Sequence, residues 1–177
     1  MVPAPVLLLA LLVAAAPAEP GTEDQVRGLL SAIDRPVPPE AWRAVGPAAE
    51  PVLAAIAGAP DELPSRRARA LEGLSALGGA RAESLHRSLA ADARAPRLVR
   101  RTAVRGLGQI LPPARLLPAA GPLLRDPDPA VRAAAAEVLA ARAPAEACGA
   151  IRTQAAGEGD GELRYRRALR SCGGTRR

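Results

Sequence analysis

Several residue types are rare or missing in this chain, and each gap narrows the possible folds and functions. Its 177 residues include no Phe, no Lys and no Asn, and only one His, one Trp, one Tyr and two Cys. Hydrophobic residues make up 49% of the chain, but aromatic residues make up only 1%. The core of a β-sheet favours aromatic and β-branched side chains, so this composition favours layers of helices built from Ala and Leu. Without Lys there is no phosphate-loop lysine, and without interleaved aromatics there is no stacking platform for single-stranded nucleic acid.

The shortage of His and Cys bears on enzymes and metals. His86 lies among polar residues of a predicted helix, and we expect it to face solvent. No cluster of His, Cys, Asp and Glu has the spacing of metal ligands, and neither Cys has a nearby His to activate it as a nucleophile. The sequence therefore predicts a protein that is not an enzyme, with no catalytic residue, no metal and no cofactor.

The N-terminal segment, residues 1–18, carries no charged side chain, and 6–16 is an unbroken apolar run. Ala16-Pro17-Ala18 has the form of a signal-peptide cleavage site, although no Arg or Lys precedes the run. The run is too short to span a bilayer. We predict that residues 1–18 are a signal peptide and that the protein is secreted or periplasmic. The alternative is a buried N-terminal helix of the fold that follows.

A repeat runs through the rest of the chain: an Ala is followed, four residues later, by an apolar residue or Cys. The pairs are Ala41/Val45, Ala70/Leu74, Ala103/Leu107, Ala135/Leu139 and Ala168/Cys172, and successive alanines are 29, 33, 32 and 33 residues apart. A period of this length, built on helical spacing, marks a solenoid of stacked helix pairs. The predicted fold is all-α, an α-solenoid of about five antiparallel helix pairs.

The helix boundaries follow from apolar stripes, prolines and glycines. We expect helices over 22–33, 40–45, 48–57, 65–77, 81–92, 97–110, 118–124, 129–141, 145–156 and 162–172, with a capping box at Thr22 and Asp128 capping the helix that starts at Pro129. No long linker divides them, so residues 19–177 are predicted to be one domain. Its parts are an N-terminal cap (19–46), central repeats (47–142) and a C-terminal cap (143–173).

The two cysteines lie on the last two predicted helices. A Gly-rich turn (157–161) joins these helices, and an antiparallel pair would place Cys148 and Cys172 at the same end. We predict a disulfide that closes a loop of about 25 residues and holds the last pair, which has a neighbour on one side only. The alternative is two free thiols in a reducing compartment.

The run from Leu123 to Leu139, LLRDPDPAVRAAAAEVL, resembles the HEAT-repeat signature and is similar to the short bacterial form seen in phycocyanobilin-lyase-type repeats. Matching positions recur in 89–107 and 65–74, so the resemblance covers most of residues 39–173. It implies a curved, right-handed solenoid that binds proteins or organises assemblies, although a fold by itself does not establish a function.

All 24 positive residues are Arg, and the net charge of +6 favours anionic partners. Three arginines stand three residues before the repeat alanines, so stacked repeats would align them in a ladder. With acids from the turns before them, we predict an inter-repeat Arg–Asp ladder; its residues are Asp92, Asp126, Arg100 and Arg132. The alternative is a strip that binds anions.

A second set of arginines shares one helix face, because Arg97, Arg101 and Arg105 are spaced i, i+4 and i+8. A further basic region runs from Arg164 to Arg177. The residues predicted to contact a partner are Arg67, Arg97, Arg100, Arg101, Arg105 and Arg132. The predicted function is an exported, non-catalytic protein-interaction or scaffold module whose arginines face an acidic protein surface. The alternatives are a binder of anionic envelope polymer or lipid, a nucleic-acid binder if the chain is not exported, and an arginine surface that is only solvated.

Overall fold

The computed structural model describes residues 21–32 and 35–173, and this part of the chain contains helices and no strand. The predicted signal peptide, 1–18, lies outside the described residues. The elements are α1 (Thr22–Leu30), α2 (Pro39–Val45), α3 (Ala49–Gly58), α4 (Pro64–Leu77), α5 (Ala80–Ala91), α6 (Arg97–Ile110), α7 (Pro113–Ala120), the 3₁₀ helix η1 (Gly121–Arg125), α8 (Pro129–Arg142), α9 (Pro144–Gly157), α10 (Gly161–Arg164) and α11 (Arg166–Gly173). None of the described helices is long and apolar enough to cross a membrane.

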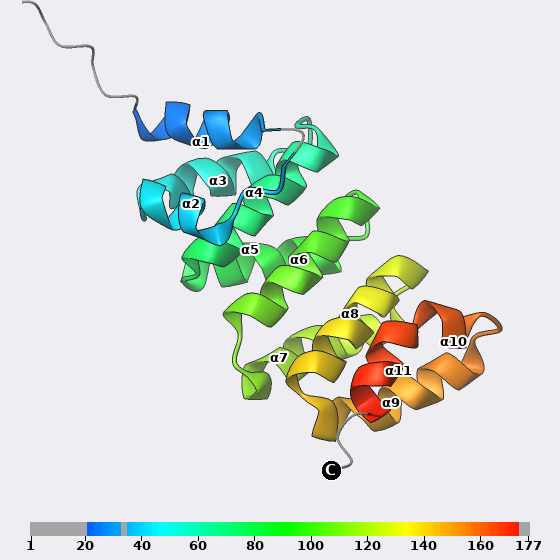
Figure 1. Ribbon diagram of the computed structural model, residues 1–177. Helices are drawn as coiled ribbons and strands as arrows, with labels where there is room; N and C mark the ends of the chain where they lie inside the picture. Colours follow the sequence, from blue (N-terminus) through cyan, green and yellow to red (C-terminus); the bar gives the residue numbers. More distant parts are fainter. Residues whose placement is uncertain (1–20, 33–34, 174–177) are drawn as a thin grey trace, which may run out of the picture.

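The helices form five consecutive pairs that stack side by side, which confirms the predicted solenoid. The second helices contact one another in series, α2 with α4, α4 with α6, α6 with α8 and α8 with α11. The first helices, α1, α3, α5, α7 with η1, and α9, pack against their own second helices. Figure 1 shows the stack running from α1 at one end to α11 at the other. The second helices thus make one continuous surface.

The core between the two layers consists mainly of Ala, Leu and Val. Four of the five repeat alanines are fully buried, and the fifth, Ala41, is partly buried. Trp42 and Tyr165, the two aromatic residues, are each about 1% exposed. Small residues bring neighbouring second helices close together. At Gly108 of α6, for example, a Cβ atom would lie 2.4 Å from Cγ1 of Val138 on α8. A core made mainly of small side chains therefore packs tightly with few aromatic residues.

The observed boundaries match most expected ones, and α6 matches at both ends. The cap of α8 is also as predicted, because the Asp128 carboxylate accepts a hydrogen bond from the Ala130 N–H at 2.8 Å. The cap of α1 differs: the helix begins at Thr22 as expected, but its N-cap residue is Gly21 and not Thr22.

Two expected helices differ in form. The helix expected over 118–124 starts earlier, at Pro113, and continues from Gly121 as the 3₁₀ helix η1. Pro122 has no N–H to donate to the carbonyl four residues before it, so the α-helical ladder stops there. The helix expected over 162–172 is divided at Tyr165 into α10 and α11.

Candidate functional site

The last pair is held by the predicted disulfide. Cys148 of α9 and Cys172 of α11 are bonded, with their Cα atoms 5.5 Å apart and a sequence separation of 24. Arg152 of α9 also donates from Nη2 to the Cys172 carbonyl oxygen at 3.1 Å. These bonds fix α11 against α9 at this end of the described stack.

The three arginines that precede the repeat alanines bind backbone carbonyls of the preceding first helix or turn. Arg67 Nε donates to the Ala57 oxygen at 3.0 Å, and Arg100 donates to the Ala90 oxygen from Nε at 3.2 Å and from Nη2 at 3.1 Å. Arg132 Nη1 donates to the carbonyls of residues 126 and 127, at 2.7 and 3.1 Å. Carbonyls at helix ends lack intrahelical donors, so each arginine satisfies groups that would otherwise stay unpaired.

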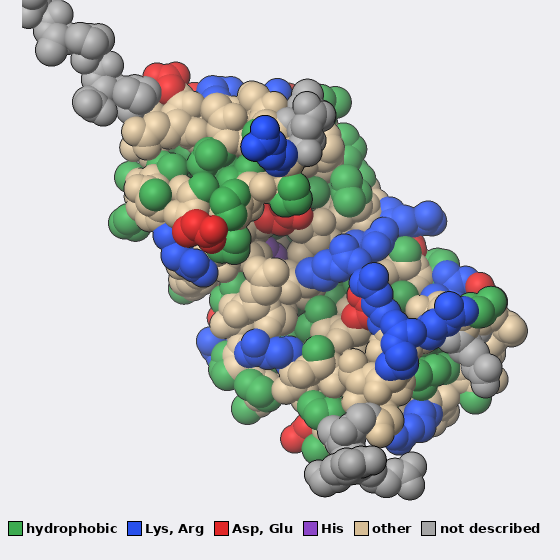
Figure 2. Space-filling model, in the orientation of Figure 1, with side chains coloured by type: hydrophobic (Ala, Val, Ile, Leu, Met, Phe, Trp, Pro, Cys, Tyr) green, Lys and Arg blue, Asp and Glu red, His purple; other side chains and the backbone are tan. Residues whose placement is uncertain are grey.

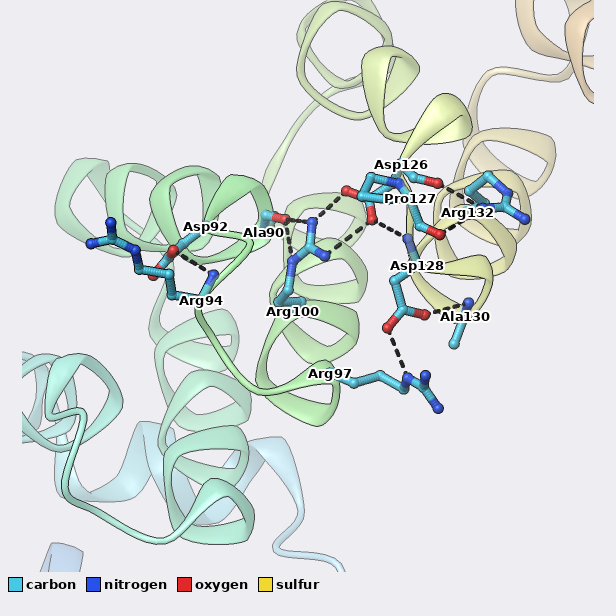
Figure 3. Close-up of polar contacts among 10 residues, drawn as sticks. All are labelled: Ala90, Asp92, Arg94, Arg97, Arg100, Asp126, Pro127, Asp128, Ala130 and Arg132. Atoms are coloured by element: carbon cyan, nitrogen blue, oxygen red, sulfur yellow. Dashed lines mark hydrogen bonds and ion pairs between the residues drawn. The ribbon is translucent and has the colours of Figure 1, made fainter.

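Two of these arginines also reach a carboxylate in the next repeat. Arg100 pairs with Asp126, through Nη1 to Oδ1 at 3.0 Å and through Nη2 to Oδ2, with both side chains buried. Arg132 pairs with Glu158, Nε to Oε1 at 2.8 Å and Nη2 to Oε2 at 2.9 Å. Figure 3 shows the Arg100–Asp126 pair and the bonds from Arg132 to the turn at 126–127. These bidentate pairs connect the third repeat to the fourth and the fourth to the fifth.

The ladder therefore exists, but two of its expected details are wrong. Asp92 is exposed and accepts from the Arg94 N–H at 2.9 Å within its own turn, instead of pairing with an arginine of the ladder. The carboxylate partner of Arg132 is Glu158, which sequence reasoning missed. Both pairs span 26 residues, Arg100 to Asp126 and Arg132 to Glu158, so a search for acids at that separation would have found Glu158.

Glu158 is the centre of a polar cluster in the last repeat. Besides Arg132, its carboxylate accepts from Tyr165 Oη at 2.6 Å and Gln154 Nε2 at 3.0 Å. The hydrogen bonds from Arg132, then those from Gln154 and Tyr165, outweigh desolvation and lower the pKa of Glu158 to about 2. Tyr165 occupies the repeat position that Arg67, Arg100 and Arg132 fill in earlier repeats, three residues before the repeat alanine.

This use of the ladder arginines corrects part of the predicted partner surface. Arg67 and Arg100 are each about 4% exposed, and most of the Arg132 side chain is covered. Their donors already bind carbonyls or carboxylates within the solenoid. These three arginines therefore do not belong to the exposed surface, because their position three residues before the repeat alanine places the side chain between repeats.

The other three predicted residues, Arg97, Arg101 and Arg105 of α6, lie on the surface. The Arg97 side chain is 64% exposed, with Nε 2.8 Å from Asp128 Oδ2, as Figure 3 shows. Arg105 is 44% exposed and only loosely paired, since its Nη2 lies 3.8 Å from Glu137 Oε2. Arg101 pairs with no carboxylate among the described side chains.

The structure adds two arginines to these three. Arg166 and Arg170 of α11 are exposed and have no carboxylate partner among the residues whose side chains are described. They stand two residues before and two after their repeat alanine, as Arg101 and Arg105 do in α6. Figure 2 shows arginines crossing this side of the molecule from α6 toward α11. We call Arg97, Arg101, Arg105, Arg166 and Arg170 the basic face; the repeat numbering alone would have revealed the last two.

The comparisons with known families agree with this architecture. The family model described as HEAT repeats matches residues 82–170, which is half of the chain. The chain belongs to the HEAT-repeat family. The matched part contains the Arg100–Asp126 and Arg132–Glu158 pairs and all of the basic face. No curated protein and no solved structure matches the chain.

HEAT repeats generally mediate protein interactions or act as scaffolds, and the family is typically non-catalytic. In this HEAT-repeat protein, His86 does not face solvent as expected but is fully buried between α4, α5 and α6. Its ring nitrogens lie 2.6 Å from the Ala82 oxygen and 2.9 Å from Ser75 Oγ, and burial lowers the pKa of His86. This Ser–His contact is closed to substrates, since His86 is 0% exposed. Across the described residues, no three His, Cys, Asp or Glu side chains are grouped to hold a metal ion.

Proposed function

We propose that this HEAT-repeat protein is an exported, non-catalytic module that binds an acidic surface of a partner protein through its basic face. The observation that carries the proposal is a set of surface arginines on α6 and α11 that pair with no carboxylate among the described side chains: the half-buried Arg101 and the exposed Arg166 and Arg170. Such guanidinium groups are available to bind carboxylates of another molecule.

The proposal separates the two classes of arginine in the repeats. The ladder arginines are covered and bond to carbonyls or carboxylates within the solenoid, so they stabilise the stack. The basic face lies at the surface, and its charges contribute to the net charge of the whole chain, which is +6. Guanidinium groups bind carboxylates in bidentate geometry and are weakly hydrated, which favours direct contact with acidic side chains. Long-range attraction by the excess positive charge would accelerate association with an acidic partner.

Export is the second part of the proposal. It rests on the apolar run 6–16, the Ala16-Pro17-Ala18 cleavage pattern and the disulfide between Cys148 and Cys172. The intact mass of the protein from its native host, measured before and after reduction and alkylation, tests it. A mass beginning at Glu19 with thiols accessible only after reduction supports export. A mass that retains residues 2–18 with free thiols contradicts it.

Binding is tested with polyglutamate as an acidic polypeptide probe. The variant R101Q/R166Q removes two positive charges from the basic face. The control R81Q/R125Q also removes two, from exposed arginines that lie outside the second helices and pair with no carboxylate among the described side chains. We expect the first variant to lower the affinity for polyglutamate by about tenfold and the second by less than about twofold. Equal losses in the two variants would show that only net charge matters and would contradict the proposal.

The two competing functions, nucleic-acid binding and binding of anionic lipid, are tested in the same assay with duplex DNA and with vesicles of anionic phospholipid. The proposal expects neither to bind as tightly as polyglutamate when compared at equal ionic strength. Tighter binding of the vesicles would indicate a lipid ligand, and tighter binding of DNA would indicate a nucleic-acid binder. Either result would overturn the proposal.

A further inference from the structure

Apolar residues lie beside the arginines of the basic face, and they recur at equivalent positions of the repeats. In the last three repeats, the positions five residues before, two before and two after the repeat alanine are exposed or half-buried. In α6 these residues are Leu98, Arg101 and Arg105. In α8 they are Ala130, Ala133 and Glu137, and in α10 and α11 they are Leu163, Arg166 and Arg170. The third and fifth repeats therefore present the same Leu-Arg-Arg unit, separated by a different one.

The two leucines are unusual in their exposure. Leu98 is 43% exposed and Leu163 is 67% exposed, and they are two of the three large hydrophobic residues exposed in the described part of the chain. Single exposed leucines are ordinary, but exposed leucines at corresponding positions of two repeats, each beside two arginines, indicate a repeated contact site.

Each unit forms a continuous surface. On α6, residues 98, 101 and 105 are spaced i, i+3 and i+7, so they share one face of the helix. At the C-terminal unit, Leu163 and Leu169 line a shallow depression of about 480 Å³ together with Arg166 and Arg170. Each unit thus combines an apolar contact with two guanidinium groups, which suits a ligand with an aliphatic group next to carboxylates.

The helix between the two units, α8, presents small side chains and one acid. Ala130 and Ala133 give it low relief, and Glu137 lies on the side of Arg105. Because neighbouring helices pack about 8–10 Å apart, two steps place the units about 20 Å apart. A ligand that contacts both must pass over α8 without placing negative charge against Glu137.

We infer that the two Leu-Arg-Arg units bind one partner segment that carries two apolar-and-acidic clusters about 20 Å apart. On an α-helical partner this separation corresponds to about 14 residues, or two heptads of one amphipathic face. This inference rests on the proposed function and names the chemistry of the partner. Two separate apolar contacts across a low helix fit a patterned polypeptide better than a bilayer, whose anionic surface would also meet Glu137.

The test uses three helical peptide probes of equal net charge and length. One carries two Leu-Glu-Glu clusters 14 residues apart, one carries a single cluster, and one has the two-cluster composition in scrambled order. We expect the two-cluster peptide to bind the full chain at least about tenfold more tightly than either of the others. Similar affinities for all three peptides would overturn the inference.

Matched leucine variants provide a second measurement. L98A/L163A should lower the affinity for the two-cluster peptide by about tenfold. L63A should change it less than about twofold, since Leu63 is 61% exposed but precedes α4 outside both units. All three leucines are exposed, so thermal unfolding of the variants should match the parent chain.

The two levels of the proposal fail in different ways. If L98A/L163A binds the two-cluster peptide as the parent does while R101Q/R166Q still weakens polyglutamate binding, the two-unit inference is wrong and the acidic-partner proposal stands. If R101Q/R166Q has no effect on any probe, the proposed function itself is wrong. If anionic vesicles compete with the two-cluster peptide and bind more tightly, the surface binds lipid and the inference is overturned.

Discussion

Gly106 of α6 offers the sharpest test of the packing between the third repeat and its neighbours. A Cβ atom at this position would lie 2.1 Å from His86 Cδ2, 2.2 Å from His86 Nε2 and 2.6 Å from Ser75 Oγ. Carbon atoms in contact are separated by about 3.5–4.0 Å, so the imidazole would have to move by about 1.5 Å. The ring has no free space to enter, because His86 is fully buried and hydrogen-bonded through both nitrogens.

The size of the effect of G106A follows from three opposing contributions. Overpacking a core of this kind destabilises by about 1–3 kcal/mol, and loss of two hydrogen bonds adds about 1 kcal/mol each. Ala is a better helix former than Gly and offsets about 1 kcal/mol. The free energy of unfolding of G106A should therefore fall by about 3 kcal/mol.

Urea denaturation followed by far-UV circular dichroism measures this change, with G149A as the matched control. Gly149 also lies within a helix, but a Cβ atom there would meet nothing within 4 Å. G149A should stabilise the protein by about 0.5–1 kcal/mol. Adding H86A to G106A should cost little more than G106A alone, because the truncated side chain leaves room for the new methyl group. Stability of G106A within about 0.5 kcal/mol of the parent would refute this account of the packing.

Three further predictions concern the bonds between repeats and within the last pair. Replacing both Cys148 and Cys172 by Ser should lower the free energy of unfolding by about 3 kcal/mol, measured in urea without reductant, because a loop of about 25 residues is no longer closed. D126A leaves the buried guanidinium of Arg100 without its carboxylate and should lower the free energy of unfolding by about 3 kcal/mol, whereas unchanged stability would refute the role of this pair. Glu158, whose pKa is lowered from 4.5 to about 2, stabilises the folded state fully above pH 4.5 and progressively less as the pH falls toward 2. E158Q should therefore flatten stability against pH across this interval, and an unchanged slope would contradict the assignment.

The fold could be predicted because the residues that repeat at a fixed period are mainly those buried in the core. The spacing of the repeat alanines identified the helix pairs, and the Asp-Pro-Asp-Pro turn located the start of α8 correctly. The cysteines were paired correctly because the Gly-rich turn fixes the two helices as antiparallel neighbours. Each of these features depends on residues close in sequence or on a fixed repeat length.

The errors arose where a residue's environment comes from another repeat. His86 has polar sequence neighbours, yet it lies on the same helix face as the buried Ala82 and Leu89, and that helical spacing is the feature that placed it in the core. Arg100 finds its carboxylate 26 residues ahead in the next repeat, whereas Asp92, which is closer in sequence, lies in an exposed turn.

The residues of the candidate site were also harder to predict than the fold. Sequence reasoning grouped arginines by repeat position and by helical spacing, and it included three that the solenoid uses internally. Exposure distinguishes the two groups, and exposure depends on which side of a second helix meets the next repeat. Once the repeat positions are numbered from the alanines, Arg166 and Arg170 become equivalent to Arg101 and Arg105, and the matching leucines follow.

The central claim is that an acidic polypeptide binds the side of the solenoid formed by α6, α8 and α11. Arginine Nε–H resonances, recorded by NMR during titration with polyglutamate, test it residue by residue. The account predicts that the signals of Arg101, Arg105, Arg166 and Arg170 shift together, while those of Arg81 and Arg125 stay in place. Equal shifts across all exposed arginines, or shifts confined to the first helices, would contradict it.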